Sequence, residues 1–138
     1  MAEVPTARAA AGRRDGERFA VEVRPEREAV VLLLSGELDH DTAEPLREAV
    51  TAALAGPGRP RLVVDCAGLR FCDSTGLNVL LRARLAAQEV GGRLELADVR
   101  QPVARMFRLT GADGVFRIHA DLAAALGGAQ GTVEEDRS

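Results

Sequence analysis

The chain has 138 residues, of which 46% are hydrophobic and 28% are charged, and its net charge is −3. These values are typical of one globular domain with a single packed core. The negative charge and the absence of Trp and Tyr argue against nucleic-acid binding, which relies on basic surfaces and on aromatic side chains that stack on bases. We therefore expect a single domain whose partner is not a nucleic acid.

The apolar segments of the sequence are too short to cross a membrane. The longest run, Ala29–Leu34, fits a buried strand. The arginine pair 13–14 is followed by the polar stretch 15–17 and not by the hydrophobic region of a signal peptide. The two cysteines, Cys66 and Cys72, fit a reducing compartment better than a disulfide framework. The prediction is a cytoplasmic protein without membrane contact.

Composition divides the chain into three parts. Residues 1–17 are rich in Ala, Arg and small polar residues without periodicity, which predicts a disordered N-terminal arm. Residues 128–138 are acidic after a Gly-rich start, which predicts a flexible tail. The segment 18–127 between them carries the periodic hydrophobic patterns and is the predicted domain.

The first part of the domain is predicted to form a hairpin and a helix. Residues 19–24 alternate in polarity and residues 29–34 are all apolar, so two strands joined by a tight turn are expected. Residues 35–41 are polar and predict a loop. Thr42 is the expected N-cap of a helix over 43–55.

The second part alternates between strands and helices. The all-apolar strand 62–66 is typical of strands that are buried on both faces of a parallel sheet. A loop over 67–73 and an amphipathic helix over 75–90 follow, and then a strand over 93–97. The last predicted elements are a helix over 102–109, a strand over 115–119 and a helix after the cap Asp121 that runs to Leu126.

The helix over 75–90 has two apolar stripes. Its buried face is expected to consist of Gly76, Val79, Leu80, Ala83, Ala87 and Val90. A second stripe, spaced by four residues, consists of Leu77, Leu81 and Leu85 and lies off that face. The second stripe either packs under a neighbouring helix or forms part of a partner surface.

This order of elements predicts an α/β protein with a mostly parallel sheet covered by helices. Open sheets of this class place their sites at the carboxyl ends of the strands. The loops 35–41 and 67–73 both follow predicted strands. We therefore expect Asp39 and Ser74 to lie close together.

Ser74 occupies a junction where a strand and a loop lead into a helix. Asp and Ser cap helix starts because their side-chain oxygens accept hydrogen bonds from the first free N–H groups. The same junction is the positive end of the helix dipole, where a phosphate is electrostatically favoured. Ser74 could therefore carry a phosphate at the surface. The alternative is that Asp73 and Ser74 only cap the helix.

A catalytic interpretation of the polar residues has weaker support. A Ser/His/Asp hydrolase needs a histidine beside the serine, for which His40 is the candidate, but the Gly-x-Ser-x-Gly elbow is missing. The histidines and cysteines do not have the spacing of metal ligands. Cys72 precedes a helix start, where a thiol pKa can fall, although a buried apolar role is favoured. We expect neither an enzyme nor a cofactor.

Three short motifs occur in a fixed order: 36–40 (Gly-Glu-Leu-Asp-His) before a helix, 73–77 (Asp-Ser-Thr-Gly-Leu) at a helix start, and 109–111 (Leu-Thr-Gly) at the end of a short helix. Together they resemble the anti-sigma factor antagonists, small stand-alone STAS-domain proteins of bacterial partner-switching systems. The resemblance spans residues 19–126. It implies the STAS fold, a mixed sheet of about four or five strands covered by about four helices.

The resemblance implies a protein substrate and not an enzyme. In this family, the unphosphorylated antagonist binds an anti-sigma factor that is itself an ATP-dependent serine kinase, and this binding releases the sigma factor. Phosphorylation of the serine in the motif ends the interaction, and a metal-dependent serine phosphatase resets it. Carried over to this sequence, the acceptor is Ser74, with Thr75 as the neighbouring hydroxyl.

The same resemblance implies a partner-binding surface. The residues at the matching motif positions are Gly36, Asp39, Asp73, Ser74, Thr75, Gly76 and Leu77. The sequence departs from the family pattern at Asn78, where a second glycine is usual, and at Cys72, where a bulkier apolar residue is usual. The first departure bears on partner choice, and neither removes the acceptor. A monomer or a weak dimer is expected.

Two alternatives remain beside this hypothesis. The chain could be a STAS subunit that scaffolds a stress-sensing or lipid-transport complex regardless of phosphorylation. It could also be an enzyme that uses a cluster of Cys72, Asp73 and Ser74, which would require an activity of the purified chain that Ser74→Ala abolishes.

Overall fold

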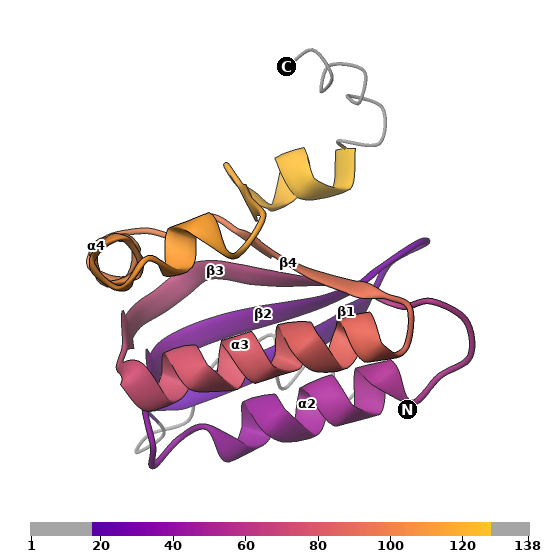
Figure 1. Cartoon of the computed structure of the whole chain (residues 1–138), viewed down its shortest axis with the longest axis horizontal. Coiled ribbons are helices and arrows are strands. Elements are labelled where there is room, and N and C mark those ends of the chain that lie inside the picture. Colours follow the sequence, from indigo (N-terminus) through magenta and orange to yellow (C-terminus); the bar gives the residue numbers. More distant parts are fainter. Residues whose placement is uncertain (1–17, 128–138) are drawn as a thin grey trace.

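One five-stranded sheet, in the order β1-β2-β3-β4-β5, organises the protein (Figure 1). The computed structural model describes residues 18–127, and the predicted arm 1–17 and tail 128–138 lie outside the described residues. The strands are β1 (Phe19–Pro25), β2 (Val30–Leu38), β3 (Arg61–Cys72), β4 (Arg93–Ala97) and β5 (Ile118–His119). β1 pairs antiparallel with β2, and the other neighbouring pairs are parallel. The predicted mixed α/β sheet is confirmed.

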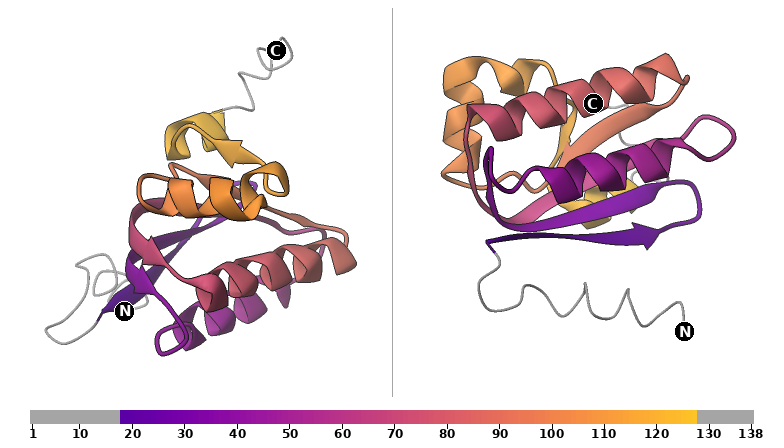
Figure 2. Two further views of the ribbon diagram at one scale, coloured as in Figure 1. Left: turned by 60° about the vertical axis from the view of Figure 1, so that its left-hand side comes forward. Right: turned by 90° about the horizontal axis from the view of Figure 1, so that it is seen from below.

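The helices cover the two faces of the sheet unequally. They are α2 (Glu44–Leu54), α3 (Ser74–Glu89), α4 (Val103–Thr110), the short 3₁₀ helix η1 (Ala112–Gly114) and a last helix over 122–127. α2 and α3 lie side by side on one face, and the last helix lies on the opposite face (Figures 1 and 2). Because β3 and β4 are added in the same direction, right-handed crossovers place both connecting helices on one face.

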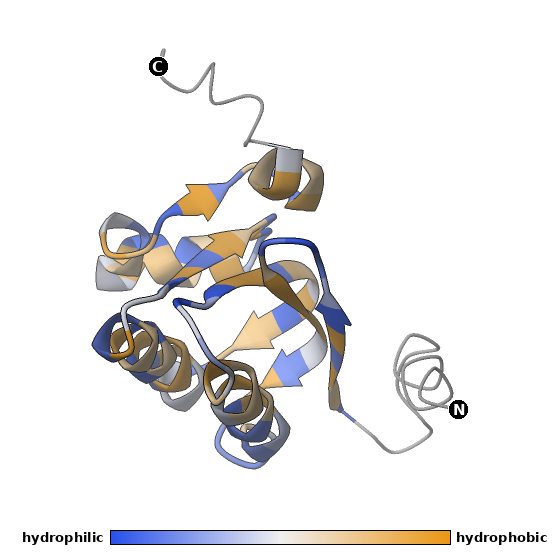
Figure 3. Ribbon diagram, turned by 90° about the vertical axis from the view of Figure 1, so that its right-hand side faces the viewer, coloured by the Kyte–Doolittle hydropathy of each residue, from blue (hydrophilic) through white to orange (hydrophobic). Residues whose placement is uncertain are grey.

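The hydrophobic core has two parts, one on each face. The larger part joins the sheet to α2, α3, α4 and η1, and its fully buried large side chains include Leu32, Leu38, Leu46, Leu62, Leu80, Leu96 and Phe107. The smaller part joins Ala29, Val31, Val63 and Ala97 to Ala125 of the last helix. The hydrophilic residues of α2 and α3 lie on their outer sides (Figure 3). Within residues 18–127, no helix combines the length and apolar character that crossing a bilayer requires.

Two predicted loops are wrong, because both are largely strand. β2 continues to Leu38 and β3 continues to Cys72, beyond the predicted ends at residues 34 and 66. The pairing of β2 with β3 has two register shifts, one between Leu33 and Ser35 and one between Gly36 and Glu37. Such bulges interrupt the alternation of buried and exposed residues. The sequence of β3 therefore does not show the period of a strand beyond Cys66.

Three smaller predictions also need correction. α2 begins at Glu44, and the preceding residue in the N-cap position is Ala43 and not Thr42. Val90 does not belong to the buried face of α3, because it lies just past the end of the helix and is exposed. The last strand is limited to residues 118–119, because η1 and the bond from Phe116 N to Ala112 O occupy the chain before it.

The second stripe on α3 passes from the core to the surface. Leu77 is buried and Leu81 packs partly buried against the main core, in agreement with the packing alternative. Leu85, at 53% exposure, lies outside the packed region. The stripe is therefore not one continuous packed or exposed surface.

Glu95 is a buried carboxylate that connects three strands with the last helix. It accepts hydrogen bonds from Arg61 Nη2 at 2.7 Å and from Arg93 Nε at 2.8 Å, and it lies 3.0 Å from His119 Nε2. Arg61 Nη2 also donates to the carbonyl oxygen of Ala125 at 3.0 Å. Burial alone would raise the pKa of Glu95, but the hydrogen bonds from Arg61 and His119 and the charges of Arg61 and Arg93 lower it from 4.5 to about 2. This network fixes the edge of the sheet.

We expect Glu95→Gln to lower the free energy of unfolding at pH 7 by about 2 kcal/mol, because the half-buried Arg61 guanidinium loses its charged partner. Since the pKa of Glu95 is depressed in the folded state, its stabilisation is complete above about pH 4.5 and is lost as the pH falls towards 2. Urea unfolding should therefore show a difference in the free energy of unfolding between variant and wild type that becomes smaller over this pH range. The matched control is Glu48→Gln, an exposed carboxylate of α2. Equal stability of Glu95→Gln and wild type at pH 7 would contradict the role given to the network.

Candidate functional site

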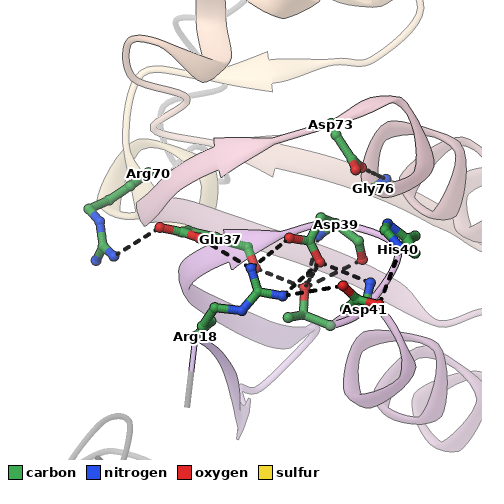
Figure 4. A network of polar contacts seen from close by, with 9 residues as sticks. Arg18, Glu37, Asp39, His40, Asp41, Arg70, Asp73 and Gly76 are labelled. Atoms are coloured by element: carbon green, nitrogen blue, oxygen red, sulfur yellow. Dashed lines mark hydrogen bonds and ion pairs between the residues drawn. The ribbon is translucent and has the colours of Figure 1, made fainter. Parts of the chain in front are cut away.

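The carboxyl ends of β2 and β3 meet at one edge of the sheet. Leu38 pairs with Cys72, and the backbone N–H of Asp73 donates to the carbonyl oxygen of Leu38 at 3.1 Å. The segments that follow, with Asp39 after β2 and Asp73 after β3, therefore leave the sheet next to each other (Figure 4). The structure confirms the expected proximity of the Asp39 and Ser74 regions.

Asp73 and Ser74 have different roles at the start of α3. Asp73 is the N-cap residue, and its Oδ1 accepts a hydrogen bond from Gly76 N at 2.9 Å. Ser74 is the first residue of the helix and is exposed. Because Asp73 performs the capping, the Ser74 side chain is not needed for it. The capping interpretation therefore holds for Asp73, and the hydroxyl of Ser74 is left at the surface.

The start of α3 is an electrostatically favourable place for an anion. The first N–H groups of a helix have no partner within the helix, and the helix dipole adds positive potential there. Asp73 satisfies the N–H of Gly76, and the N–H groups of Ser74 and Thr75 precede it in the first turn. A phosphate on the Ser74 hydroxyl would lie beside these groups.

Gly76 allows the first turn of α3 to approach the end of β2. A Cβ at this position would lie 2.8 Å from both Leu38 Cγ and Leu38 O, and 3.0 Å from Cys72 Sγ. Separations of this size are below ordinary contact distances, so any side chain would push the helix start away from the sheet. The glycine therefore sets the position from which Ser74 is presented.

The Asp39 loop is held by a network of polar contacts. Thr42 Oγ1 accepts from Asp39 N at 2.9 Å and donates to Glu37 O at 2.8 Å, so Thr42 closes this loop and does not cap α2. Arg18 Nη1 donates to Asp39 Oδ2 at 2.9 Å. This hydrogen bond from Arg18 holds the pKa of Asp39 below its usual value, so Asp39 is an anion at neutral pH. Figure 4 shows the network around this carboxylate.

Three residues that sequence reasoning missed border the same region. Arg18 also lies 3.4 Å from Glu37 Oε1 and 3.8 Å from Asp41 Oδ2. Arg70 Nη2 lies 3.8 Å from Glu37 Oε2. Phe71, next to Arg70 on β3, is 45% exposed. Arg70 and Phe71 fell within a predicted loop, and no pattern around Arg18 indicated its contact with Asp39.

The structure places Cys66 and Cys72 in the core and His40 at the surface. Burial raises the pKa of Cys72 to about 12, and the charge of Asp73 adds to this, so the thiol is not activated by the helix start. Cys66 is likewise a buried free thiol whose pKa burial raises. His40 is exposed and lies 3.2 Å from Asp41 Oδ1. Within residues 18–127, no group of three or more His, Cys, Asp or Glu side chains could hold a metal ion.

The predicted site residues divide into exposed and buried sets. Ser74 is exposed, and Asp39, Asp73 and Thr75 are half-buried at the same edge. The other three, Gly36, Gly76 and Leu77, are buried and support this edge from beneath. Gly36 has a φ of 98°, a left-handed conformation that favours glycine at the second register shift of β2.

Comparisons with known proteins agree on one family. The family model described as "Mlab, STAS domain" matches residues 21–126. The anti-sigma F factor antagonist of Paenibacillus polymyxa is 32% identical over 91 residues, which cover 66% of this chain and 78% of that protein. The chain therefore belongs to the STAS domain family and, within it, to the anti-sigma factor antagonists.

Solved structures support the same assignment. The crystal structure of an anti-sigma factor antagonist from Mycobacterium paratuberculosis has a TM-score of 0.69 and 30% identity, and the match covers 78% of this chain and 91% of that chain. The Bacillus cell fate determinant SpoIIAA in its phosphorylated form has a TM-score of 0.62 and 28% identity, with coverages of 78% and 96%. The STAS fold predicted from the sequence is confirmed.

Gly76→Ala is expected to lower the free energy of unfolding by about 2 kcal/mol, because the added methyl group overlaps Leu38. Thermal or urea unfolding measures this change. Gly56→Ala is the matched control, since a Cβ at Gly56 would meet no atom within 4 Å. A Gly76→Ala variant as stable as the control would show that α3 does not depend on this close approach.

Proposed function

We propose that the unphosphorylated protein binds an anti-sigma factor with serine kinase activity and thereby releases a sigma factor. The observation that carries this proposal is the exposed Ser74 at the first position of α3, beside the Asp39 loop. The proposed contact surface consists of Ser74, Asp73, Thr75 and Asp39, with Gly36, Gly76 and Leu77 as its buried support. Membership of the anti-sigma factor antagonists supports the choice of partner.

Ser74 is the proposed phosphate acceptor. Its exposure makes the hydroxyl accessible to a kinase, and the helix start favours the phosphate that results. Thr75, the second residue of α3, is only half-exposed and is the less accessible hydroxyl. The related Bacillus SpoIIAA, known in a phosphorylated form, is a precedent for phosphorylation in this family.

Phosphorylation would end binding by electrostatic repulsion. A kinase that modifies Ser74 must bring the phosphates of its nucleotide to this hydroxyl. A phosphate on Ser74 adds about −1.5 to −2 charge and then faces those phosphates as well as Asp73. Shifting the population from 99:1 bound to 1:99 requires about 5.5 kcal/mol of differential affinity. Like charges brought together across an interface cost several kcal/mol, before the cost of desolvating the phosphate.

The remaining parts of the proposal follow from the switch. A serine phosphatase would restore the binding form, and the chain would act as a monomer or weak dimer and not as an enzyme.

The two free thiols, Cys66 and Cys72, support a reducing location such as the cytoplasm. The family match over residues 21–126 supports a single STAS domain over 18–127, flanked by the arm and the acidic tail.

Incubation of the purified protein with an extract of its host and ATP should add one phosphate to Ser74. Intact mass and peptide mapping would detect it. Ser74→Ala should remain unmodified, while Thr75→Val, which removes only the neighbouring hydroxyl, should still be phosphorylated. If wild type stays unmodified in extracts from several growth conditions, or co-purifies with a large complex regardless of phosphate, the constitutive scaffold would replace this proposal.

Phosphorylation of Ser74 is expected to leave the fold intact, because Asp73 continues to cap α3 through Gly76 N. Amide hydrogen exchange should change only around the first turn of α3, with protection unchanged in the core of β2, β3 and β4. Increased exchange across these strands in the phosphorylated form would contradict a surface switch and indicate unfolding instead.

A further inference from the structure

Phe71 is the one phenylalanine of the chain that is not buried. The chain has four phenylalanines and neither Trp nor Tyr. Phe19, Phe107 and Phe116 belong to the main core, and the rings of Phe107 and Phe116 stack with their centroids 5.9 Å apart. Phe71 is 45% exposed. Large aromatic side chains contribute strongly when they are buried in a contact, so an exposed ring is a candidate contact residue.

A register shift in the sheet places Phe71 at the surface. Gly36 pairs with Leu69 and Glu37 pairs with Phe71, so Arg70 is an extra residue in β3. Leu69 and Cys72 are buried on either side, whereas Arg70 and Phe71 are both exposed. Bulges of this kind redirect side chains and are frequent next to functional sites. The backbone itself therefore turns Phe71 outward.

Phe71 belongs to the end of β3 that leads to Ser74. Phe71 is three residues before Ser74 and pairs with Glu37, the residue that binds Arg70 and Arg18. At the ends of β2 and β3, carboxylates outnumber guanidinium groups four to two: Glu37, Asp39, Asp41 and Asp73 against Arg18 and Arg70. An apolar ring within an acidic border is complementary to an apolar pocket with basic side chains beside it.

We propose that Phe71 is the apolar anchor of the contact with the anti-sigma factor, and that it inserts into an apolar pocket of that protein bordered by basic side chains. This inference rests on the proposed function and adds to it. Phe71 supplies affinity in the unphosphorylated form, while Ser74 supplies the switch. A buried aromatic anchor surrounded by a polar rim is the usual arrangement of an interaction hot spot.

The test compares the affinities of full-length variants for the purified host kinase that phosphorylates Ser74. Phe71→Ala should weaken binding of the unphosphorylated chain by about 10-fold or more, and Phe71→Leu by less. The control is Val23→Ala, which removes an exposed apolar side chain of similar exposure, 40%, at a position paired with Leu32, far along β2 from Glu37. The control should bind like wild type. Circular dichroism and thermal unfolding would confirm that each variant is folded.

The dependence of binding on ionic strength tests the proposed basic border of the partner's pocket. Binding of wild type should weaken as salt rises from about 0.05 to 0.5 M, because attraction between the acidic border and basic partner residues is screened. Glu37→Gln should reduce this salt dependence. Binding that is independent of salt would overturn the proposed basic border.

The outcomes separate this inference from the proposed function. Wild type that binds and a Phe71→Ala variant of equal affinity would overturn the inference and leave the proposed function intact. Tighter binding by Phe71→Ala would show that the ring is covered by another part of this chain. Loss of self-association in Phe71→Ala, measured by sedimentation, with unchanged affinity for the kinase would assign the ring to a second copy. No binding by wild type would contradict both proposals.

Discussion

The site depends on the close packing of the first turn of α3 against the end of β2. Two contacts define it: the hydrogen bond from Asp73 N to Leu38 O, and the approach of Gly76 to Leu38, which leaves no room for a Cβ. Together they bring the residues after β2 and β3 to one edge and place Ser74 at the surface. The burial of Gly76 and the exposure of Ser74 thus both follow from the close packing of α3 against β2.

The negative charge at this edge is partly offset in the free protein. Arg18 holds Asp39 as an anion, Arg70 contacts Glu37, and the start of α3 offsets negative charge near Ser74. A phosphate on Ser74, as proposed, would therefore be tolerated while water surrounds it. In the proposed complex, a partner that covers this edge would remove that water and bring its own charges close, so the phosphate would be costly only there. In the proposed function, the fold therefore stays intact and the switch acts at the interface.

Local patterns predicted most of the fold and an exposed serine close to the start of α3. The strand over 93–97 was predicted with its observed ends, and α3 within one residue of its start, because polarity alternation, glycines and a capping Asp mark them clearly. The ends of β2 and β3 could not be predicted, since the bulges that shape them depend on pairing between distant residues. For the same reason the contact of Arg18 with Asp39, the loop closure by Thr42 and the exposure of Phe71 had no signal in the sequence.

The central claim is that one phosphate on Ser74 decides whether the protein binds its anti-sigma factor. Calorimetric titration of the purified anti-sigma factor with the unphosphorylated and the Ser74-phosphorylated chain tests it most directly. The account predicts that the phosphorylated form binds about 10⁴-fold more weakly, the ratio that a nearly complete population switch requires. Equal affinities of the two folded forms would contradict it.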